Sequence, residues 1–203
     1  MILTDTTILK EMENGNIVVE PFFRENLGTN SIDLTLAPEI LYYTEAYEYL
    51  FKKNMYGFKG NCNLLPLYKE HYLDAKKDNA TKKFNIDEEG FLLNPGMLYI
   101  ASTNEYTETH NAVPKLEGKS SIGRLGLFVH VTAGYGDVGF CGKWTLELVA
   151  TVPIKIYPNM KICQISYHGI SEPPLVKYGD KKDNKYQNQD SPTASMMHKN
   201  FDK

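Results

Sequence analysis

The segment EGKSSIGR, residues 117–124, gathers two cations and two hydroxyls around a pair of glycines. The side chains of Lys119, Ser120, Ser121 and Arg124 can all donate hydrogen bonds, and the glycines let the backbone approach a bound anion closely. Such a set of donors suits a polyphosphate. The segment is not a P-loop, because the spacing of that motif's glycines and its Gly-Lys-Ser/Thr ending are missing. A surface turn with solvated charges and helix-capping serines fits the same residues.

A second candidate is the glycine-rich loop AGYGDVGF at residues 133–140, which holds a single acid, Asp137. Its carboxylate could accept a hydrogen bond from a sugar hydroxyl or hold a water molecule. An aspartate that caps a turn is the ordinary alternative.

The third candidate is Glu147, which lies between Leu146 and Leu148. In a strand its carboxylate points to the opposite face from the two leucines. If that face lines a pocket, Glu147 suits general acid and base catalysis. If that face meets solvent, Glu147 is only a polar strand residue, and the pattern by itself favours this second interpretation.

Zinc chemistry is not indicated by the spacing of histidines and cysteines. The zinc deaminases use His-x-Glu and Pro-Cys-x-x-Cys, and neither motif occurs. No two histidines are three to five residues apart, so we expect no metal ligands. We expect His130, in the apolar run 127–131, to be a hydrogen-bonded core or interface residue rather than a ligand. A serine hydrolase is disfavoured as well, because Ile122 stands where Gly-x-Ser-x-Gly needs its last glycine.

Composition narrows the class of protein. The chain has 203 residues, 42% of them hydrophobic, and a net charge of -3, which indicates a soluble domain with one core or two small ones. It has neither an apolar run of about eighteen residues nor a secretory leader, so we expect no membrane partner. The pI of 6.0 argues against nucleic-acid binding. Three scattered cysteines, Cys62, Cys141 and Cys163, favour a reducing cytoplasm.

The elements that must position these candidates are mostly short strands. Residues 4–15 predict one amphipathic helix that ends at Gly15. Strands are predicted, with turns about every 8 to 12 residues, at 17–19, 32–36, 97–102, 125–132, 143–151, 154–157 and 162–167. This arrangement predicts an all-β barrel or jelly roll.

Two segments fall outside this pattern. Residues 42–90 show no sustained periodicity, and we interpret them as a peripheral insertion with two short strands or a helix and long loops. Residues 171–203 are polar, and composition alone favours a disordered terminus.

Taken together, the segments resemble the deoxycytidine triphosphate (dCTP) deaminase family of the deoxyuridine triphosphatase (dUTPase)-like superfamily. The resemblance is strongest in LEGKSSIGRLGL at 116–127, TAG at 132–134, D-x-G-F-x-G at 137–142 and TLE at 145–147. Weaker matches are LTD at 3–5, NSIDL at 30–34, NPG at 94–96, KYQNQ at 185–189 and PTAS at 192–195. Only residues of about 42–90 lie outside it.

The resemblance implies a distorted β-barrel or jelly roll over residues 1–170, with a short N-terminal helix, and a nucleotide-closing lid over residues 171–203. It also implies a homotrimer whose active sites are shared between subunits. The implied substrates and ligands are dCTP, dUTP and dTTP. Mg²⁺ is implied only as the counterion of the triphosphate.

The resemblance also implies a role for each candidate residue. Glu147 is the metal-free general base, and Ser120 and Arg124 hold it and the attacking water. Lys119, Ser120, Ser121 and Arg124 are triphosphate and catalytic donors, and Asp137 contacts the deoxyribose. The backbone of Thr145, Leu146 and Glu147 reads the pyrimidine, while Tyr178, Lys185 and Gln189 close over the triphosphate.

Three functions remain open on this basis. Deamination of dCTP to dUTP and ammonia ranks first. A bifunctional enzyme that continues to dUMP and diphosphate ranks second. A nucleotide-binding regulator without catalysis is the third, and the presence of Ser120, Arg124 and Glu147 argues against it.

Overall fold

The computed structural model describes residues 1–45, 47 and 72–202, and most of their ordered structure is β-strand. The strands are β1 (Ile17–Glu20), β2 (Ile32–Tyr43), β3 (Thr81–Asn85), β4 (Phe91–Leu93), β5 (Leu98–Thr109), β6 (Ala112–Gly118), β7 (Leu127–Val129), β8 (Cys141–Ala150), β9 (Ile154–Ile156) and β10 (Lys161–Gly169). The helices are α1 (Asp5–Glu13) and the single turn α3 (Ser120–Gly123), with 3-10 turns at Arg24–Asn26, Tyr178–Asp180 and Met197–Asn200.

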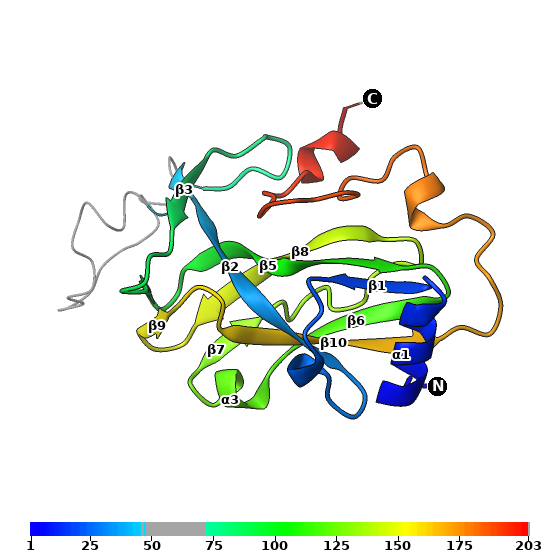
Figure 1. The fold of residues 1–203 in the computed structure, drawn as a ribbon. Coiled ribbons are helices and arrows are strands. Elements are labelled where there is room, and N and C mark those ends of the chain that lie inside the picture. The colour runs from blue at the N-terminus through cyan, green and yellow to red at the C-terminus, as the bar shows by residue number, and fades with distance from the viewer. Residues whose placement is uncertain (46, 48–71, 203) are drawn as a thin grey trace.

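Eight strands form one antiparallel sheet with the order β6-β10-β2-β5-β8-β7, in which β1 also pairs with β5 and β3 with β2. Strands β4 and β9 form a separate pair. The large sheet curves into a nearly closed barrel (Figure 1). The predicted mainly β, barrel-like fold with a short N-terminal helix is confirmed.

The barrel interior is filled by alternate residues of each strand. In β8, buried and half-buried residues alternate along the whole strand. Trp144, Leu146 and Leu148 belong to the buried set, and Leu146 and Leu148 have no exposed surface. Full burial of each such side chain contributes about 1.5–3 kcal/mol. The packing of the leucines therefore turns Thr145 and Glu147 to the outer face of the sheet.

The helix α1 begins after Thr4 and ends at Glu13; Asn14 caps it, and Gly15 follows with a left-handed φ of 72°. Ile8 is fully buried, while Leu9 and Met12 are half-buried. The predicted helix is confirmed with almost the predicted bounds.

The predicted strand at 125–132 is wrong at both ends, because β7 covers only Leu127–Val129. Before it, Gly126 has a φ of 84°, and a Cβ there would lie 2.3 Å from Oγ1 of Thr151. After it, His130 has a φ of 49°, which a side-chain-bearing residue rarely adopts and which ends the strand. His130 is therefore not within a strand, as the sequence suggested, but in the loop that follows.

The insertion predicted at 42–90 is described only in part. Strand β2 continues to Tyr43, and β3 pairs with its end through Glu39 to Tyr43. The rest of the prediction for this segment lies largely on residues 46 and 48–71, which are outside the described residues.

The C-terminal segment follows a defined path over the barrel. It turns back after β10 and crosses above β8 (orange to red in Figure 1). The amide of Asn188 donates to the carbonyl of Cys141 at 2.8 Å, and the amide of Lys143 donates to the carbonyl of Gln189 at 2.8 Å. Further along, the amide of Ser195 donates to the hydroxyl of Tyr43 at 2.9 Å.

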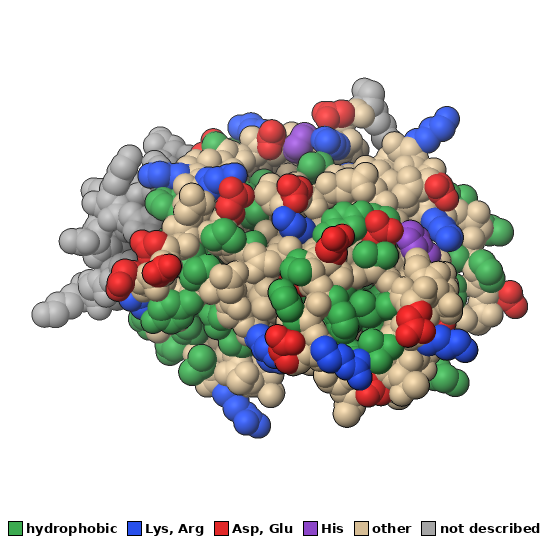
Figure 2. Space-filling model, viewed as in Figure 1, with side chains coloured by type: hydrophobic (Ala, Val, Ile, Leu, Met, Phe, Trp, Pro, Cys, Tyr) green, Lys and Arg blue, Asp and Glu red, His purple; other side chains and the backbone are tan. Residues whose placement is uncertain are grey.

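On the face shown in Figure 2, acidic and basic side chains of the described residues are interspersed rather than gathered by sign. None of the described helices combines the length and apolar character that crossing a membrane requires.

Candidate active site

A pocket of about 640 Å³ lies between β7, β8 and the C-terminal segment. Five residues that the sequence indicated line it: Asp137, Thr145, Glu147, Tyr178 and Gln189. They come from the glycine-rich loop, from the outer face of β8 and from the chain end. The fold therefore brings together residues that are up to about fifty positions apart in the sequence.

Glu147 is held on the pocket wall by the loop that follows β7. The hydroxyl of Thr132 donates to its Oε2 at 3.0 Å, and Nδ1 of His130 lies 3.5 Å from the same oxygen. The backbone amide of His130 also donates to the carbonyl of Glu147 at 2.8 Å. The side chain keeps 37% of its surface exposed, so the carboxylate is oriented and yet accessible to water.

Sequence reasoning missed the place of His130. Its side chain is only 10% exposed, and its ring meets that of Trp144 edge-on at 6.2 Å. Its Nε2 lies 2.9 Å from the carbonyl of Ala133, which can only accept, so Nε2 carries a proton. In the neutral ring Nδ1 is then an acceptor that faces Glu147. Only the left-handed backbone at His130 produces this orientation, and no spacing in the sequence signals it.

Among the described residues, no strand pairs with the outer edge of β8 at Thr145. Alternate residues of a strand direct their backbone groups to the same neighbouring strand. On this edge the amide of Lys143 donates to the carbonyl of Gln189, and the carbonyl of Glu147 accepts from the amide of His130. Thr145 lies between them, where β7 has already ended, and its side-chain hydroxyl contacts Gln189 Oε1 at 3.1 Å. The backbone at Thr145 is thus available to a flat polar ligand in the pocket.

Aromatic side chains form the opposite part of the pocket. The rings of Phe140 and Trp144 are 4.9 Å apart, and Phe140 also contacts Tyr178 at 6.2 Å. The indole of Trp144 donates to Oγ1 of Thr107 at 2.9 Å, which fixes the ring. No role was predicted for the side chains of Phe140 and Trp144, because a buried aromatic residue is ordinarily part of the core.

The predicted anion-binding segment does not line this pocket. Ser120, Ser121 and Arg124 are exposed on α3 and the turn after it, and no lysine or arginine is among the described residues that line the pocket. Within one chain, the predicted anion-binding segment therefore lies apart from the carboxylate of Glu147.

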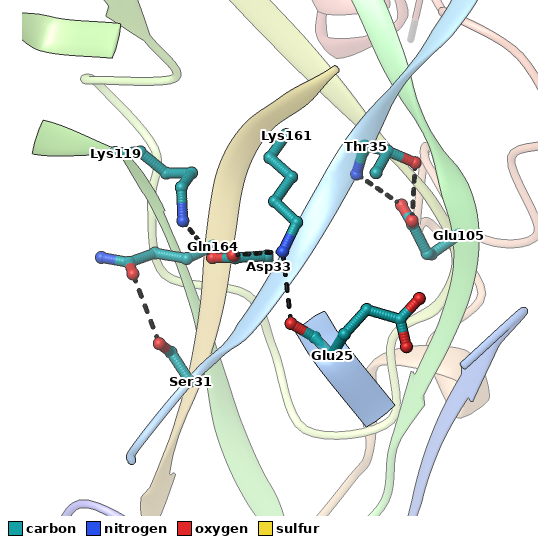
Figure 3. Close-up of polar contacts among 8 residues, drawn as sticks. All are labelled: Glu25, Ser31, Asp33, Thr35, Glu105, Lys119, Lys161 and Gln164. Atoms are coloured by element: carbon teal, nitrogen blue, oxygen red, sulfur yellow. Dashed lines mark hydrogen bonds and ion pairs between the residues drawn. The ribbon is translucent and has the colours of Figure 1, made fainter. Parts of the chain in front are cut away.

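Lys119 is instead part of an ionic network on the barrel wall (Figure 3). Asp33 pairs with Lys119 and, at 3.3 Å, with Lys161. Nζ of Lys161 also donates to the carbonyl of Glu25 at 3.3 Å. Asp33 of the NSIDL segment therefore holds the side chain of Lys119 next to α3.

Two other predicted residues are not placed for side-chain contact with a ligand in the pocket. Leu146 is fully buried, so only its backbone could take part. Lys185 does not line the pocket, and its Nζ bonds to Oδ1 of Asn200 within the C-terminal segment.

Residues 2–170 match the family described as dCTP deaminase-like. The chain belongs to this family, which confirms the resemblance found in the sequence. The expected class of enzyme, a hydrolase that acts on the cytosine amine, follows from the family.

The chain is 47% identical to "dCTP deaminase, dUMP-forming" of Clostridium botulinum strain Eklund 17B over 204 residues, and the alignment covers 100% of both chains. It is 44% identical to the protein of the same name from Cytophaga hutchinsonii over 203 residues, again covering 100% of both.

Among solved structures, the 2'-deoxycytidine 5'-triphosphate deaminase of Agrobacterium tumefaciens superposes with a TM-score of 0.57 at 19% identity. The superposition covers 83% of this chain and 48% of that one, so the chain spans about half of that protein. This likeness supports the fold.

Proposed function

We propose that this protein is a bifunctional dCTP deaminase that converts dCTP to dUMP, ammonia and diphosphate. The observation that carries the proposal is the identity of 47% over the full length with a relative named as dUMP-forming. Sequence analysis ranked deamination to dUTP first, and the relatives favour the alternative. The pocket is compatible with deamination alone and with the bifunctional reaction. It is lined by the oriented carboxylate of Glu147, by the edge of β8 at Thr145 and by aromatic side chains.

In the proposed deamination, Glu147 takes a proton from a water molecule, and the resulting hydroxide attacks C4 of cytosine. Glu147 then returns the proton to the departing amine, which leaves as ammonia. The hydroxyl of Thr132 fixes Oε2 during both transfers, and the backbone amide of His130 holds the carbonyl of Glu147. A second water then cleaves the bond between the α- and β-phosphates and releases diphosphate.

In the same proposal the backbone of Thr145, Leu146 and Glu147 reads the pyrimidine edge, and Asp137 accepts from the deoxyribose 3'-hydroxyl. Tyr178 and Gln189 cover the nucleotide from the C-terminal segment, which acts as a lid over residues 171–203. Closure of the lid would exclude bulk water from the reacting atoms. Lys185 would have to leave Asn200 to reach the triphosphate.

The site is shared between subunits in this proposal. No lysine or arginine is among the described residues of the pocket wall, whereas Lys119, Ser120, Ser121 and Arg124 lie exposed or half-exposed elsewhere on the same chain. At the pocket mouth, Phe128, Val131 and Tyr135 are 51%, 71% and 63% exposed, which suits coverage by another copy of the chain. A homotrimer in which one subunit donates the cations to its neighbour's pocket satisfies both observations.

Mg²⁺ would enter with the triphosphate as its counterion. Phosphate oxygens and water molecules can occupy most of its six coordination positions, so it does not need a dedicated set of protein ligands. We expect the enzyme to work in the cytoplasm, where its substrates are made and its thiols stay reduced.

The experiment is to incubate the purified protein with dCTP and Mg²⁺ and to follow ammonia and diphosphate separately. Release of both supports the proposal. Ammonia alone would identify a deaminase that stops at dUTP, and neither product would identify a nucleotide-binding regulator.

A further inference from the structure

A group of metal-ligating side chains lies outside the pocket, at the far end of the β5–β8 pair. The antiparallel register places Glu108 directly opposite Cys141. Residues two apart on a strand point to the same side, so His110, just beyond the end of β5, lies next to Glu108. The ligand atoms of these three residues all lie within 4.8 Å of one another, and all three residues are half-buried.

We propose that Glu108, His110 and Cys141 bind a divalent cation of the zinc class. A thiolate, an imidazole and a carboxylate are ligands that Zn²⁺ prefers, with a water molecule as the fourth. Bond lengths of about 2.0–2.3 Å put the ligand atoms of a tetrahedral site roughly 3.3–3.8 Å apart. Side-chain shifts of about 1 Å would therefore close the observed group around an ion.

The surrounding contacts already orient the carboxylate for this role. The hydroxyl of Tyr106 donates to Oε1 of Glu108 at 2.8 Å, which leaves Oε2 for an ion. Nε2 of His110 lies 2.9 Å from that Oε2, so an ion would replace the proton that the two atoms share. The thiol of Cys141 would release its proton to solvent on binding. Tyr106 is a positioning residue in this site, since it acts through Glu108.

The site adjoins the anchor of the C-terminal segment but not the reacting atoms. The amide of Cys141 donates to Oε1 of Gln187 at 3.2 Å, and its carbonyl accepts from Asn188. An ion on Cys141 would thus stiffen the strand that holds this segment. None of the three ligands lines the pocket, so the site is independent of the proposed function.

The test is titration of the full-length protein with ZnCl₂ and, as a spectroscopic probe, with CoCl₂. We expect one ion per chain, a thiolate-to-Co²⁺ charge-transfer band and a higher melting temperature with Zn²⁺. Cys141→Ser should abolish the band, and His110→Gln should weaken binding at least about tenfold. Tyr106→Phe should weaken it about 10- to 100-fold, as loss of an outer hydrogen bond to a ligand does.

Cys62→Ser is the matched control, because it removes a thiol that is not one of the proposed ligands, and it should keep the band and the affinity. Circular dichroism of each variant checks that it is folded. Absence of saturable binding, or a band that survives in Cys141→Ser and disappears in Cys62→Ser, would overturn the proposal.

Discussion

At the scale of single residues, the orientation of Glu147 is set by its neighbours rather than by its own strand alone. Leu146 and Leu148 turn it outward, the Thr132 hydroxyl donates to Oε2, and the His130 amide holds its backbone carbonyl. A carboxylate fixed in this way is ready to exchange a proton with a water molecule. The contact from Thr132 could remain if a neutral amide replaced the carboxylate, but the proton transfer could not.

Glu147→Gln should therefore retain dCTP binding and lose ammonia release. General acid and base catalysis contributes about 10²- to 10⁴-fold, and a loss in that range or beyond is expected. Binding is measured by calorimetry and ammonia by a coupled assay. Glu39→Gln, on the surface ion pair with Lys83, is the control and should act like the parent. Ammonia release by Glu147→Gln within about tenfold of the parent would refute the assigned base.

Glu105 offers a test of stability instead of catalysis. It is 1% exposed, and both of its oxygens accept from Thr35, at 2.7 and 2.9 Å. Burial raises the pKa of this carboxyl, and the hydrogen bonds from Thr35 offset part of the rise. Between the ordinary pKa and the raised one, the folded chain binds more protons than the unfolded chain, so stability falls as pH rises.

The free energy of unfolding of the parent, relative to Glu105→Gln, should thus increase as the pH is lowered from about 8 towards 5. Urea unfolding of both proteins across this range measures the difference. Since other titrating groups are common to both, they cancel. A difference that is independent of pH, or that grows as the pH rises, would contradict the role given to burial.

At the scale of elements, the loop that carries Asp137 is set by close packing at Gly136. A Cβ on Gly136 would lie 2.5 Å from the ring of Trp144 and 2.9 Å from Cγ of Pro114. The absence of a side chain at Gly136 therefore makes room for the indole of Trp144.

Gly136→Ala should lower the free energy of unfolding by about 1–3 kcal/mol, the usual cost of overpacking. It should also weaken dCTP binding, since Trp144 and Asp137 both line the pocket. Gly123→Ala is the control for stability, because a Cβ there meets no atom within 4 Å. Equal stability of the two variants in urea would contradict this prediction, because the ring of Trp144 would then be able to move aside without loss of stability.

The fold could largely be predicted from the sequence because alternation of apolar residues marks a strand whatever its partners are. The strand through Glu147 is an example. The helix before Gly15 was predictable for a different reason, namely its single apolar face and the glycine at its end. The site was predictable only in part. Motif residues such as Asp137 and Gln189 were found, but His130 depends on a left-handed φ, and Cys141 with Glu108 depends on pairing between strands. Neither the backbone conformation of His130 nor the pairing of the two strands can be recognised from the spacing of residues in the sequence.

At the scale of the whole molecule, the separation of the pocket from the Lys119–Arg124 segment is the reason to propose an oligomer with shared sites. The pocket contains the carboxylate of Glu147, the edge of β8 and the aromatic side chains, but none of its described residues is a lysine or an arginine. If subunits share sites, each pocket depends on a neighbour.

Co-expression of Glu147→Gln and Arg124→Ala chains tests this dependence. Each variant alone should be inactive. In randomly mixed trimers, about a quarter of the sites would combine an intact Glu147 with an intact Arg124 from the neighbour, so about a quarter of the parent's activity should return. Activity no greater than the sum of the two variants would contradict shared sites.

The central claim is that one enzyme carries dCTP through to dUMP. The most direct measurement uses dCTP labelled in its ring, with an excess of unlabelled dUTP and Mg²⁺, followed by chromatography of the labelled products. We predict that label enters dUMP at the rate at which ammonia is released, with none in dUTP. Accumulation of label in dUTP, with dUMP lagging behind the ammonia, would contradict it.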